Sequence, residues 1–139
     1  NNLADQLIKD FLIKCDNRDS AVRMLSGGNM QKVVTAREFS NNPHLVVANQ
    51  PTRGVDVGAT EFIRKKIVQL RDDGTAVLLI SADLNEVLEL SDSLIVMHNG
   101  HIAAYIPDAS KITDMELGEY MLGVKEQTPE EIARVAYDR

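Results

Sequence analysis

The chain has 139 residues, of which 44% are hydrophobic and 26% charged, with a net charge of −6. This composition is typical of one ordinary globular domain, and the acidic balance argues against general affinity for nucleic acid. No apolar run is long enough to span a bilayer, and the single Cys15 cannot form an internal disulfide. A reducing compartment is the simpler interpretation.

The first predicted element is an amphipathic helix over residues 1–14. Its apolar residues recur at helical spacing and are Leu3, Leu7, Ile8, Phe11 and Leu12. We interpret it as a packing helix without chemistry of its own. Residues 16–20 are polar and are predicted to form a loop.

A Ser26-Gly27-Gly28 sequence precedes a second predicted helix over residues 29–39. The first N–H groups of a helix have no internal partner, and the helix dipole makes that end positive. With the Ser26 hydroxyl, this end is predicted to hold a terminal phosphate, although a plain helix start is the common alternative. Lys32 is either a phosphate contact or an ordinary exposed lysine. The residues expected to face a core are Met30, Val33, Val34 and Phe39.

Residues 45–48 and 75–81 are apolar runs that suit strands buried on both faces of a parallel sheet. Between them, Asp56 is predicted to cap a helix that ends at Asp72-Asp73-Gly74. One face of this helix is expected to be buried, with Ala59, Ile63, Ile67 and Leu70. Its other face is expected to be solvated, with Arg64, Lys65, Lys66 and Arg71.

The rest of the chain carries local start and stop signals. Asp83 is predicted to cap a helix over residues 83–90, and Asn99-Gly100 predicts a hairpin between strands 93–97 and 102–106. Thr113 and Thr128 are predicted to start the last two helices. His98 and His101 flank the turn, but no third ligand is evident, so no metal site is predicted.

The alternation of strands and helices predicts an α/β fold. Four motifs then resemble those of ABC-type ATPases. Residues 25–32 resemble the signature motif, residues 45–52 the Walker B strand, residues 54–56 the D-loop, and residues 80–84 the position of the switch histidine. The forms LSGGN-x-QK and PTRGVDVGA look most like bacterial ATPases that import sugars and nucleosides, in which two ATPase domains are commonly fused. The resemblance covers residues 23–125.

No G-x-x-x-x-G-K-[ST] phosphate loop is present. The resemblance therefore implies a partial P-loop NTPase domain, the C-terminal half of the second ATPase domain of a tandem protein. It implies a helical subdomain and signature helix in residues 1–40, a catalytic-core part in 41–125 and a tail in 126–139, all within one domain. Because the strand at residues 45–48 would have an unpaired edge, we expect the isolated fragment to dimerise.

The resemblance also assigns site residues. Where the family has Asp-Glu and a histidine, this chain has Asn49, Gln50 and Ala82, which neither hold Mg²⁺ well nor act as a base. The chain's own catalytic site is thus expected to be degenerate, and the fragment alone inactive. The resemblance implies that ATP is contacted in trans by Ser26, Gly27, Gly28, Asn29 and Gln31, and that Asp56 lies at a dimer interface.

The implied function is that of an ABC importer ATPase subunit on the cytoplasmic face of a bacterial membrane. Its signature would complete an ATP site on a partner domain that bears the phosphate loop, and permease subunits would couple hydrolysis to sugar or nucleoside import. ATP and Mg²⁺ are expected in the full transporter and none on the isolated fragment. The alternative is a structural coupling module that binds no nucleotide. A DNA-repair or chromosome ATPase is disfavoured by the acidic balance and the PTRGVD form.

Overall fold

The structure is a computed structural model that describes residues 2–137. The chain divides into two compact units, residues 1–80 and residues 81–139, and each is described by itself. The predicted boundaries at residues 40 and 125 stay predictions. Among the described residues, no helix has the length and apolar character needed to cross a membrane.

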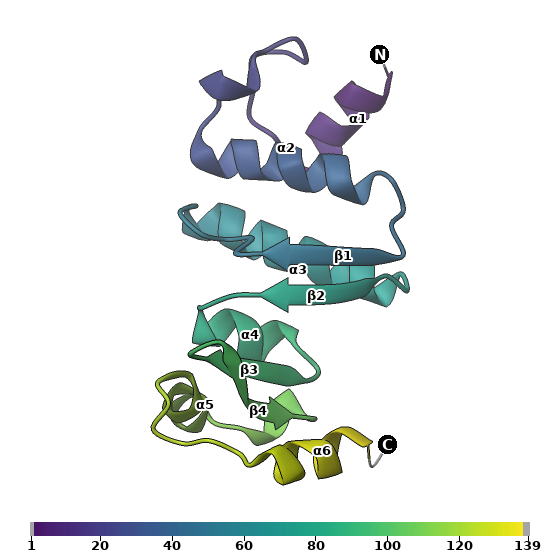
Figure 1. Ribbon diagram of the computed structural model, residues 1–139. Coiled ribbons are helices and arrows are strands. Elements are labelled where there is room, and N and C mark those ends of the chain that lie inside the picture. The colour runs from purple at the N-terminus through teal and green to yellow at the C-terminus, as the bar shows by residue number, and fades with distance from the viewer. Residues whose placement is uncertain (1, 138–139) are drawn as a thin grey trace. The chain divides into compact units, whose positions relative to one another are not determined.

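In its described part, residues 2–80, the first unit contains three helices, a 3₁₀ turn and a two-stranded parallel sheet (Figure 1). They are α1 (Asn2–Asp10), the turn (Val22–Met24), α2 (Gly27–Phe39), β1 (Leu45–Asn49), α3 (Val57–Asp72) and β2 (Ala76–Ile80). Both strands point toward the side of the unit at which α2 begins (Figure 1). The carboxyl end of β1 and the N-terminus of α2 therefore share one end of this unit.

Helix α1 ends four residues before the predicted end at residue 14. Leu12 has a φ of 50°, and the N–H of Ile13 donates to the carbonyl of Ile8 at 2.9 Å. This is the geometry of a helix C-terminus closed by a residue in the left-handed region, a position that glycine usually takes. The chain then turns, which places Phe11 and Ile13 in the core of the first unit.

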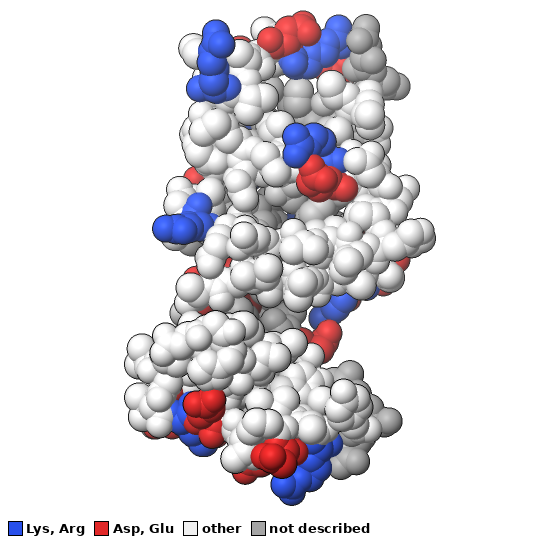
Figure 2. All heavy atoms as spheres, viewed as in Figure 1, with Lys and Arg blue, Asp and Glu red and all other residues white. Residues whose placement is uncertain are grey.

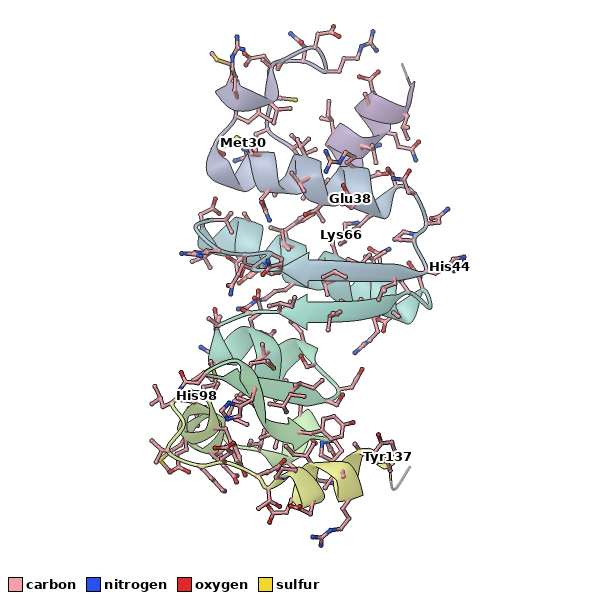
Figure 3. The ribbon with its side chains drawn as sticks, viewed as in Figure 1. Met30, Glu38, His44, Lys66, His98 and Tyr137 are labelled. Atoms are coloured by element: carbon pink, nitrogen blue, oxygen red, sulfur yellow. The ribbon has the colours of Figure 1, made fainter. Side chains whose placement is uncertain are left out.

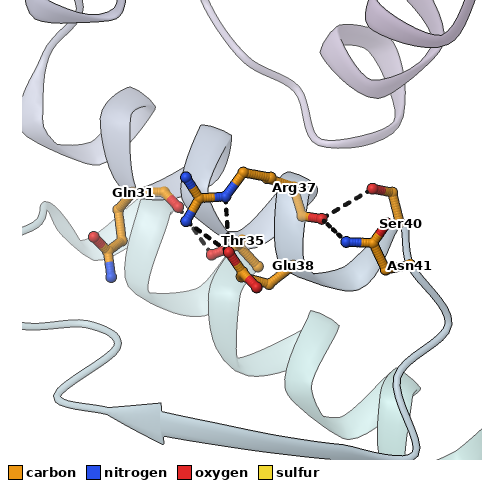
Figure 4. Close-up of polar contacts among 6 residues, drawn as sticks. All are labelled: Gln31, Thr35, Arg37, Glu38, Ser40 and Asn41. Atoms are coloured by element: carbon orange, nitrogen blue, oxygen red, sulfur yellow. Dashed lines mark hydrogen bonds and ion pairs between the residues drawn. The ribbon is translucent and has the colours of Figure 1, made fainter.

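Helix α2 begins two residues earlier than predicted and is closed by side chains at its end. Thr35 donates to the carbonyl of Gln31 at 2.9 Å, and the Arg37 carbonyl accepts from Ser40 and Asn41 at 3.0 and 3.2 Å (Figure 4). The two bonds to the Arg37 carbonyl satisfy a group that the end of a helix leaves without a partner. The Thr35 bond lies inside the helix and reaches the carbonyl four residues before it. Arg37 also pairs with its neighbour Glu38 on the exposed side.

The side of α2 that is buried carries small residues. Gly28, Thr35 and Ala36 are buried, whereas Met30 and Val34 are exposed. The prediction that Met30 and Val34 face the core is therefore wrong, because α2 packs through its small residues and turns these larger side chains outward. The prediction for Val33 and Phe39 is confirmed, since both pack against the core.

The core of the first unit forms around Phe11. Its ring lies 6.3 Å from that of Phe39 and 6.1 Å from that of Phe62, both in edge-to-face arrangements. Lys66 places its Nζ 5.0 Å from the centre of the Phe11 ring, in the region between α2 and α3 (Figure 3). Because a cation over an aromatic face is a packed arrangement, the expectation of a purely solvated role for Lys66 is wrong.

Helix α3 follows its prediction in part. Three residues of the predicted apolar face are buried, but Leu70 is only half-buried, and Arg64, which was expected to be solvated, is half-buried as well. Its buried residues are Ala59, Ile63 and Ile67. It ends at Asp72, and Gly74 follows with a φ of 94°. The helix packs behind the sheet in the view of Figure 1 and covers one face of it.

The sheet pairs Leu45–Asn49 with Ala76–Ile80 in parallel register. The expectation that its strands are buried on both faces is wrong for this chain. Side chains on one face are exposed, with Leu45 at 59% and Val47 at 57%, because the helices of this unit cover only the other face. Figure 2 shows a broad uncharged surface over these strands, with acidic and basic side chains interspersed elsewhere on that face. His44 precedes β1 at the far end of the strand (Figure 3).

Over residues 81–137, the second unit contains four helical elements and an antiparallel hairpin. They are α4 (Leu84–Leu90), β3 (Leu94–His98), β4 (His101–Ile106), a 3₁₀ turn (Ala109–Lys111), α5 (Asp114–Met121) and α6 (Pro129–Tyr137). The predicted hairpin is confirmed, with Asn99 and Gly100 at φ values of 47° and 81°, as a type I′ turn requires.

The caps predicted in this unit are confirmed. Asp83 accepts from the N–H of Glu86 at 3.2 Å, and Thr113 accepts from that of Glu116 at 3.2 Å. The segment before the last helix is bound to the hairpin, since the Gln127 N–H donates to the Ala103 carbonyl at 2.9 Å, and α6 itself contacts β4. The unit's core consists of Leu94, Val96, Ala104, Ala109, Ile112, Leu117 and Tyr120.

Candidate functional site

The N-terminus of α2 is capped by Ser26. Ser26 is extended, with φ −63° and ψ 157°, and its Oγ accepts from the Asn29 N–H at 3.4 Å. The same Oγ accepts from Asn29 Nδ2 at 2.9 Å. Asn29 Oδ1 in turn accepts from the backbone N–H of Lys14 at 2.8 Å. The cap is thus tied to the segment that follows α1.

The two glycines of this end lie in different surroundings. Gly27 is exposed, and a Cβ placed on it would meet only the Gly54 carbonyl oxygen, at 3.8 Å. Gly28 is buried, and a Cβ placed on it would lie 2.9 Å from Asp56 Oδ2 and 3.1 Å from Ala59 Cβ. Gly27 therefore leaves open space beside the helix end, whereas Gly28 allows α2 and α3 to approach closely.

The loop after β1 carries the two amide residues. Gln50 has a φ of 48°, and its N–H donates to the Ile80 carbonyl at 2.8 Å, so strand pairing continues to this residue. Asn49 is exposed and Gln50 is half-buried. A left-handed backbone at a residue other than glycine is a strained feature that is common at functional sites.

The side chain of Gln31 joins this loop to α2. Its Nε2 donates to the carbonyl of Pro51 at 2.9 Å. Sequence reasoning assigned Gln31 to ATP and missed this role, because no local signal in the sequence tells which loop a helix will meet. Lys32 also lies away from the helix end, since its Nζ donates to the Leu12 carbonyl at 3.1 Å and lies 4.8 Å from the centre of the Phe62 ring.

Asp56 caps α3, as predicted. Its Oδ1 accepts from the N–H of Ala59 at 2.9 Å. This hydrogen bond holds the pKa of Asp56 below its usual value of 3.8, against the effect of desolvation, and the charge of Lys32 acts in the same direction. The carboxylate is therefore ionised at neutral pH and is committed to the helix start beside Gly28.

The residues at this end fit a phosphate better than a metal ion. Ser26 offers a hydroxyl and Gly27 an open backbone at the positive end of a helix, which is the usual setting for an anion. Asn49 and Gln50 offer neutral amides, whereas Mg²⁺ is held by carboxylates. Within residues 2–137 no group of three or more His, Cys, Asp or Glu side chains is placed to hold a metal. The donor set does not fit Mg²⁺.

The structure brings most of the predicted site residues of the first unit to one end. Ser26, Gly27, Gly28 and Asn29 lie at the start of α2, with Asp56 against Gly28. Ala82 belongs to the second unit, where it is exposed just before the Asp83 cap of α4.

The sequence has close relatives among transport ATPases. It is 43% identical over 123 residues to the nucleoside import ATP-binding protein NupA of Lactococcus lactis, covering 88% of this chain. It is 44% identical over 120 residues to the guanosine import ATP-binding protein NupO of Bacillus subtilis, covering 86% of this chain. It is 48% identical over 101 residues to the glucose import ATP-binding protein TsgD13 of Haloferax volcanii, covering 71% of this chain. No family model matches the chain.

Solved structures agree with these relatives. The ADP conformation of MJ1267, an ATP-binding cassette of an ABC transporter, aligns with 99% of this chain at 26% identity and a TM-score of 0.63. A nucleotide-free cassette from an ABC transporter aligns with 99% of it at 28% identity and a TM-score of 0.66. The chain belongs to the ABC ATPases. The dimeric cassette MJ0796, at 24% identity and a TM-score of 0.67, supports the fold alone.

This ABC ATPase chain is a partial domain. It spans about a quarter of the length of the curated relatives it matches, 24% for NupA and 23% for NupO. It covers 50% of the MJ1267 cassette. The expected α/β partial cassette is therefore confirmed.

Proposed function

We propose that this chain is part of an ABC importer ATPase subunit and that its signature completes an ATP site in trans. The observation that carries the proposal is the open end of α2. Ser26 caps this end with a hydroxyl, and Gly27 leaves the adjacent backbone uncovered. A phosphate held by a partner domain's phosphate loop would meet backbone N–H groups at the positive end of a helix. Under this proposal, Ser26, Gly27 and Gly28 contact the phosphate of the ATP that the partner domain holds.

The chain's own catalytic position does not hydrolyse ATP under this proposal. Asn49 and Gln50 keep nearly the size of the carboxylic residues that the family has there but carry no charge. A neutral amide is not basic enough to accept a proton from an attacking water. Ala82 has no hydrogen-bond donor for a phosphate. The active site is therefore the one that the signature completes, and ATP and Mg²⁺ are held mainly by the partner domain.

The names of the relatives indicate the solute class. They are described as import proteins for nucleosides, guanosine and glucose. We therefore propose sugar or nucleoside import, with the ATPase at the cytoplasmic face of the membrane and bound to permease subunits. The D-loop residue Asp56 would lie at the interface with the partner ATPase domain. The mixed surface charge of Figure 2 does not offer a single basic patch on that face for nucleic acid.

The exposed face and edges of the β1–β2 sheet favour self-association of the isolated fragment. Leu45, Val47, Leu78 and Ile80 are exposed large apolar residues on β1 and β2, and the free strand edges can pair with another chain. We expect the isolated fragment to sediment as a dimer or larger species at micromolar concentration. A single monomeric boundary would contradict this part of the proposal.

The decisive experiment measures ATP turnover by the full-length protein assembled with its permease partners, with and without Gly27→Asp. A carboxylate at residue 27 would occupy the phosphate position and repel it, so turnover is expected to fall by about a hundredfold, the scale of a lost phosphate-stabilising element. Gly27→Ala separates bulk from charge. Its Cβ meets no close contact within the chain but would approach the phosphate, so it is expected to lower turnover less than Gly27→Asp does. Unchanged turnover in Gly27→Asp would instead make this chain a structural coupling module.

A further inference from the structure

We propose that Asn29 is a positioning residue that turns the hydroxyl of Ser26 outward as a hydrogen-bond donor. The inference rests on the proposed function, because the acceptor it serves is the terminal phosphate at the signature. It differs from the assignment of Asn29 as a direct contact to ATP. The evidence is the pattern of donors and acceptors around Ser26.

The first step is the occupancy of the Ser26 oxygen. A serine hydroxyl has two acceptor sites and one hydrogen to donate. Asn29 fills both acceptor sites, one through its Nδ2 at 2.9 Å and one through its backbone N–H at 3.4 Å. Because both bonds come from donors, the hydroxyl hydrogen is directed away from Asn29. Among residues 2–137 it has no acceptor, and Ser26 is exposed at the helix end.

The second step is the orientation of the Asn29 amide. Oxygen and nitrogen of an amide are told apart by their hydrogen-bond partners. The backbone N–H of Lys14 can only donate, and it lies 2.8 Å from the Asn29 side chain, so the atom it meets is Oδ1. Nδ2 must then face Ser26. The loop after α1 therefore fixes which way the amide points and, through it, which way the hydroxyl points.

The third step is the consequence for a phosphate. A hydroxyl free to rotate spends part of its time as an acceptor, which would repel an anion. With both acceptor sites filled from within the chain, Ser26 is held in the donor state before the phosphate arrives. A donor that needs no reorganisation stabilises charge more effectively than a mobile one. Asn29 thus acts on the phosphate through Ser26.

A double-mutant cycle tests this in the full-length protein with its permease partners. The four proteins are the wild type, Ser26→Ala, Asn29→Ala and the double variant, and the readouts are kcat and KM for ATP and the unfolding midpoint. Ser26→Ala is expected to lower kcat/KM at least about tenfold, the value of a hydrogen bond to a charged group. Asn29→Ala is expected to lower it severalfold in the wild type and to have no further effect in the Ser26→Ala background. An equal loss of kcat/KM on introducing Asn29→Ala into the wild type and into Ser26→Ala would overturn the inference.

Asn29→Asp is the sharper variant. Its carboxylate keeps the bond from Lys14 but cannot donate to Ser26, and it would accept the hydroxyl hydrogen and turn it inward. Turnover is expected to fall as far as in Ser26→Ala, with an unchanged unfolding midpoint. The effect of the added charge alone is measured by comparing turnover in the double variant Ser26→Ala/Asn29→Asp with turnover in Ser26→Ala.

The two proposals fail in different ways. If Ser26→Ala leaves turnover unchanged, the signature is not used and the proposed function fails, and this inference with it. If Ser26→Ala lowers turnover but Asn29→Asp behaves as the wild type, the function stands and the inference is wrong. Loss in Asn29→Asp that persists equally in the Ser26→Ala background also overturns the inference, since Asn29 would then act independently of Ser26.

Discussion

Gly28 and Asp56 lie so close that an ideal Cβ on Gly28 would be 2.9 Å from the Oδ2 of Asp56. The first residues of α2 and α3 therefore meet at the same end of the first unit, where the residues predicted to form the signature and the D-loop both lie. Asp56 is committed to capping α3 through Ala59, so it cannot easily move aside. This contact makes the position of the signature helix depend on the start of the next helix.

Gly28→Ala is expected to destabilise the protein. The added methyl would displace the capping carboxylate of Asp56 and press on Ala59 Cβ, which is 3.1 Å away. Overpacking of this kind costs about 1–3 kcal/mol, which outweighs the gain in helix propensity. Denaturant unfolding measures the effect. Gly27→Ala is the matched control and is expected to be neutral or slightly stabilising, since its methyl meets nothing closer than 3.8 Å. Equal stability of the two variants would contradict the packing argument.

Asp56 is expected to make stability depend on pH in the acid range. The hydrogen bond from the Ala59 N–H lowers its folded pKa below the unfolded value of 3.8, so the ionised form is favoured in the folded state. Its contribution is present above pH 3.8 and is lost as the pH falls through the folded pKa. Asp56→Asn can still cap the helix but does not titrate. The difference in free energy of unfolding between wild type and Asp56→Asn should shrink on acidification to about pH 2, and a constant difference would contradict this.

Much of the local structure could be predicted from the sequence. Asp56, Asp83 and Thr113 each cap the helix that was predicted to follow, and Asn99-Gly100 forms the predicted hairpin turn. These signals are local, since a cap or a turn depends on residues within three or four positions. The order of the motifs also predicted the family.

The remaining features depend on tertiary contacts. Leu12 ends α1 in a left-handed backbone conformation, which a leucine in the sequence does not predict. Met30 and Val34 are exposed because α2 packs through its small residues. One face of β1 is exposed because the helices of the first unit cover only the other face of the sheet, which the strand sequence alone does not reveal. The orientation of Asn29 was equally hidden, because Lys14 lies 15 residues away in the sequence.

Gly123→Ala is expected to destabilise the second unit. Gly123 has a φ of 71°, and a Cβ on it would lie 2.7 Å from Cδ2 of His98, which contacts the Met121 carbonyl through Nδ1 at 3.0 Å. Backbone strain and displacement of the ring together should cost about 1–3 kcal/mol in free energy of unfolding. Gly118→Ala lies nearby in α5 with nothing within 4 Å of its Cβ, and it is expected to stabilise by up to about 1 kcal/mol. The free energy of unfolding should therefore fall in Gly123→Ala and rise in Gly118→Ala, and a change of the same sign in both variants would contradict this prediction.

Gln31→Glu is expected to loosen the loop after β1 from α2. The amide donates to the Pro51 carbonyl at 2.9 Å, and a carboxylate of the same shape has no hydrogen to donate and would repel that oxygen. A half-buried carbonyl left unpaired costs about 1–3 kcal/mol. Amide exchange should quicken across residues 50–56, and the free energy of unfolding should fall. Gln6→Glu on the exposed surface of α1 makes the same chemical change without a partner, so it should alter neither. If Gln31→Glu matched Gln6→Glu, the bond to Pro51 would not hold the loop, and Gln31 would be free for the direct ATP contact that the family resemblance assigns to it.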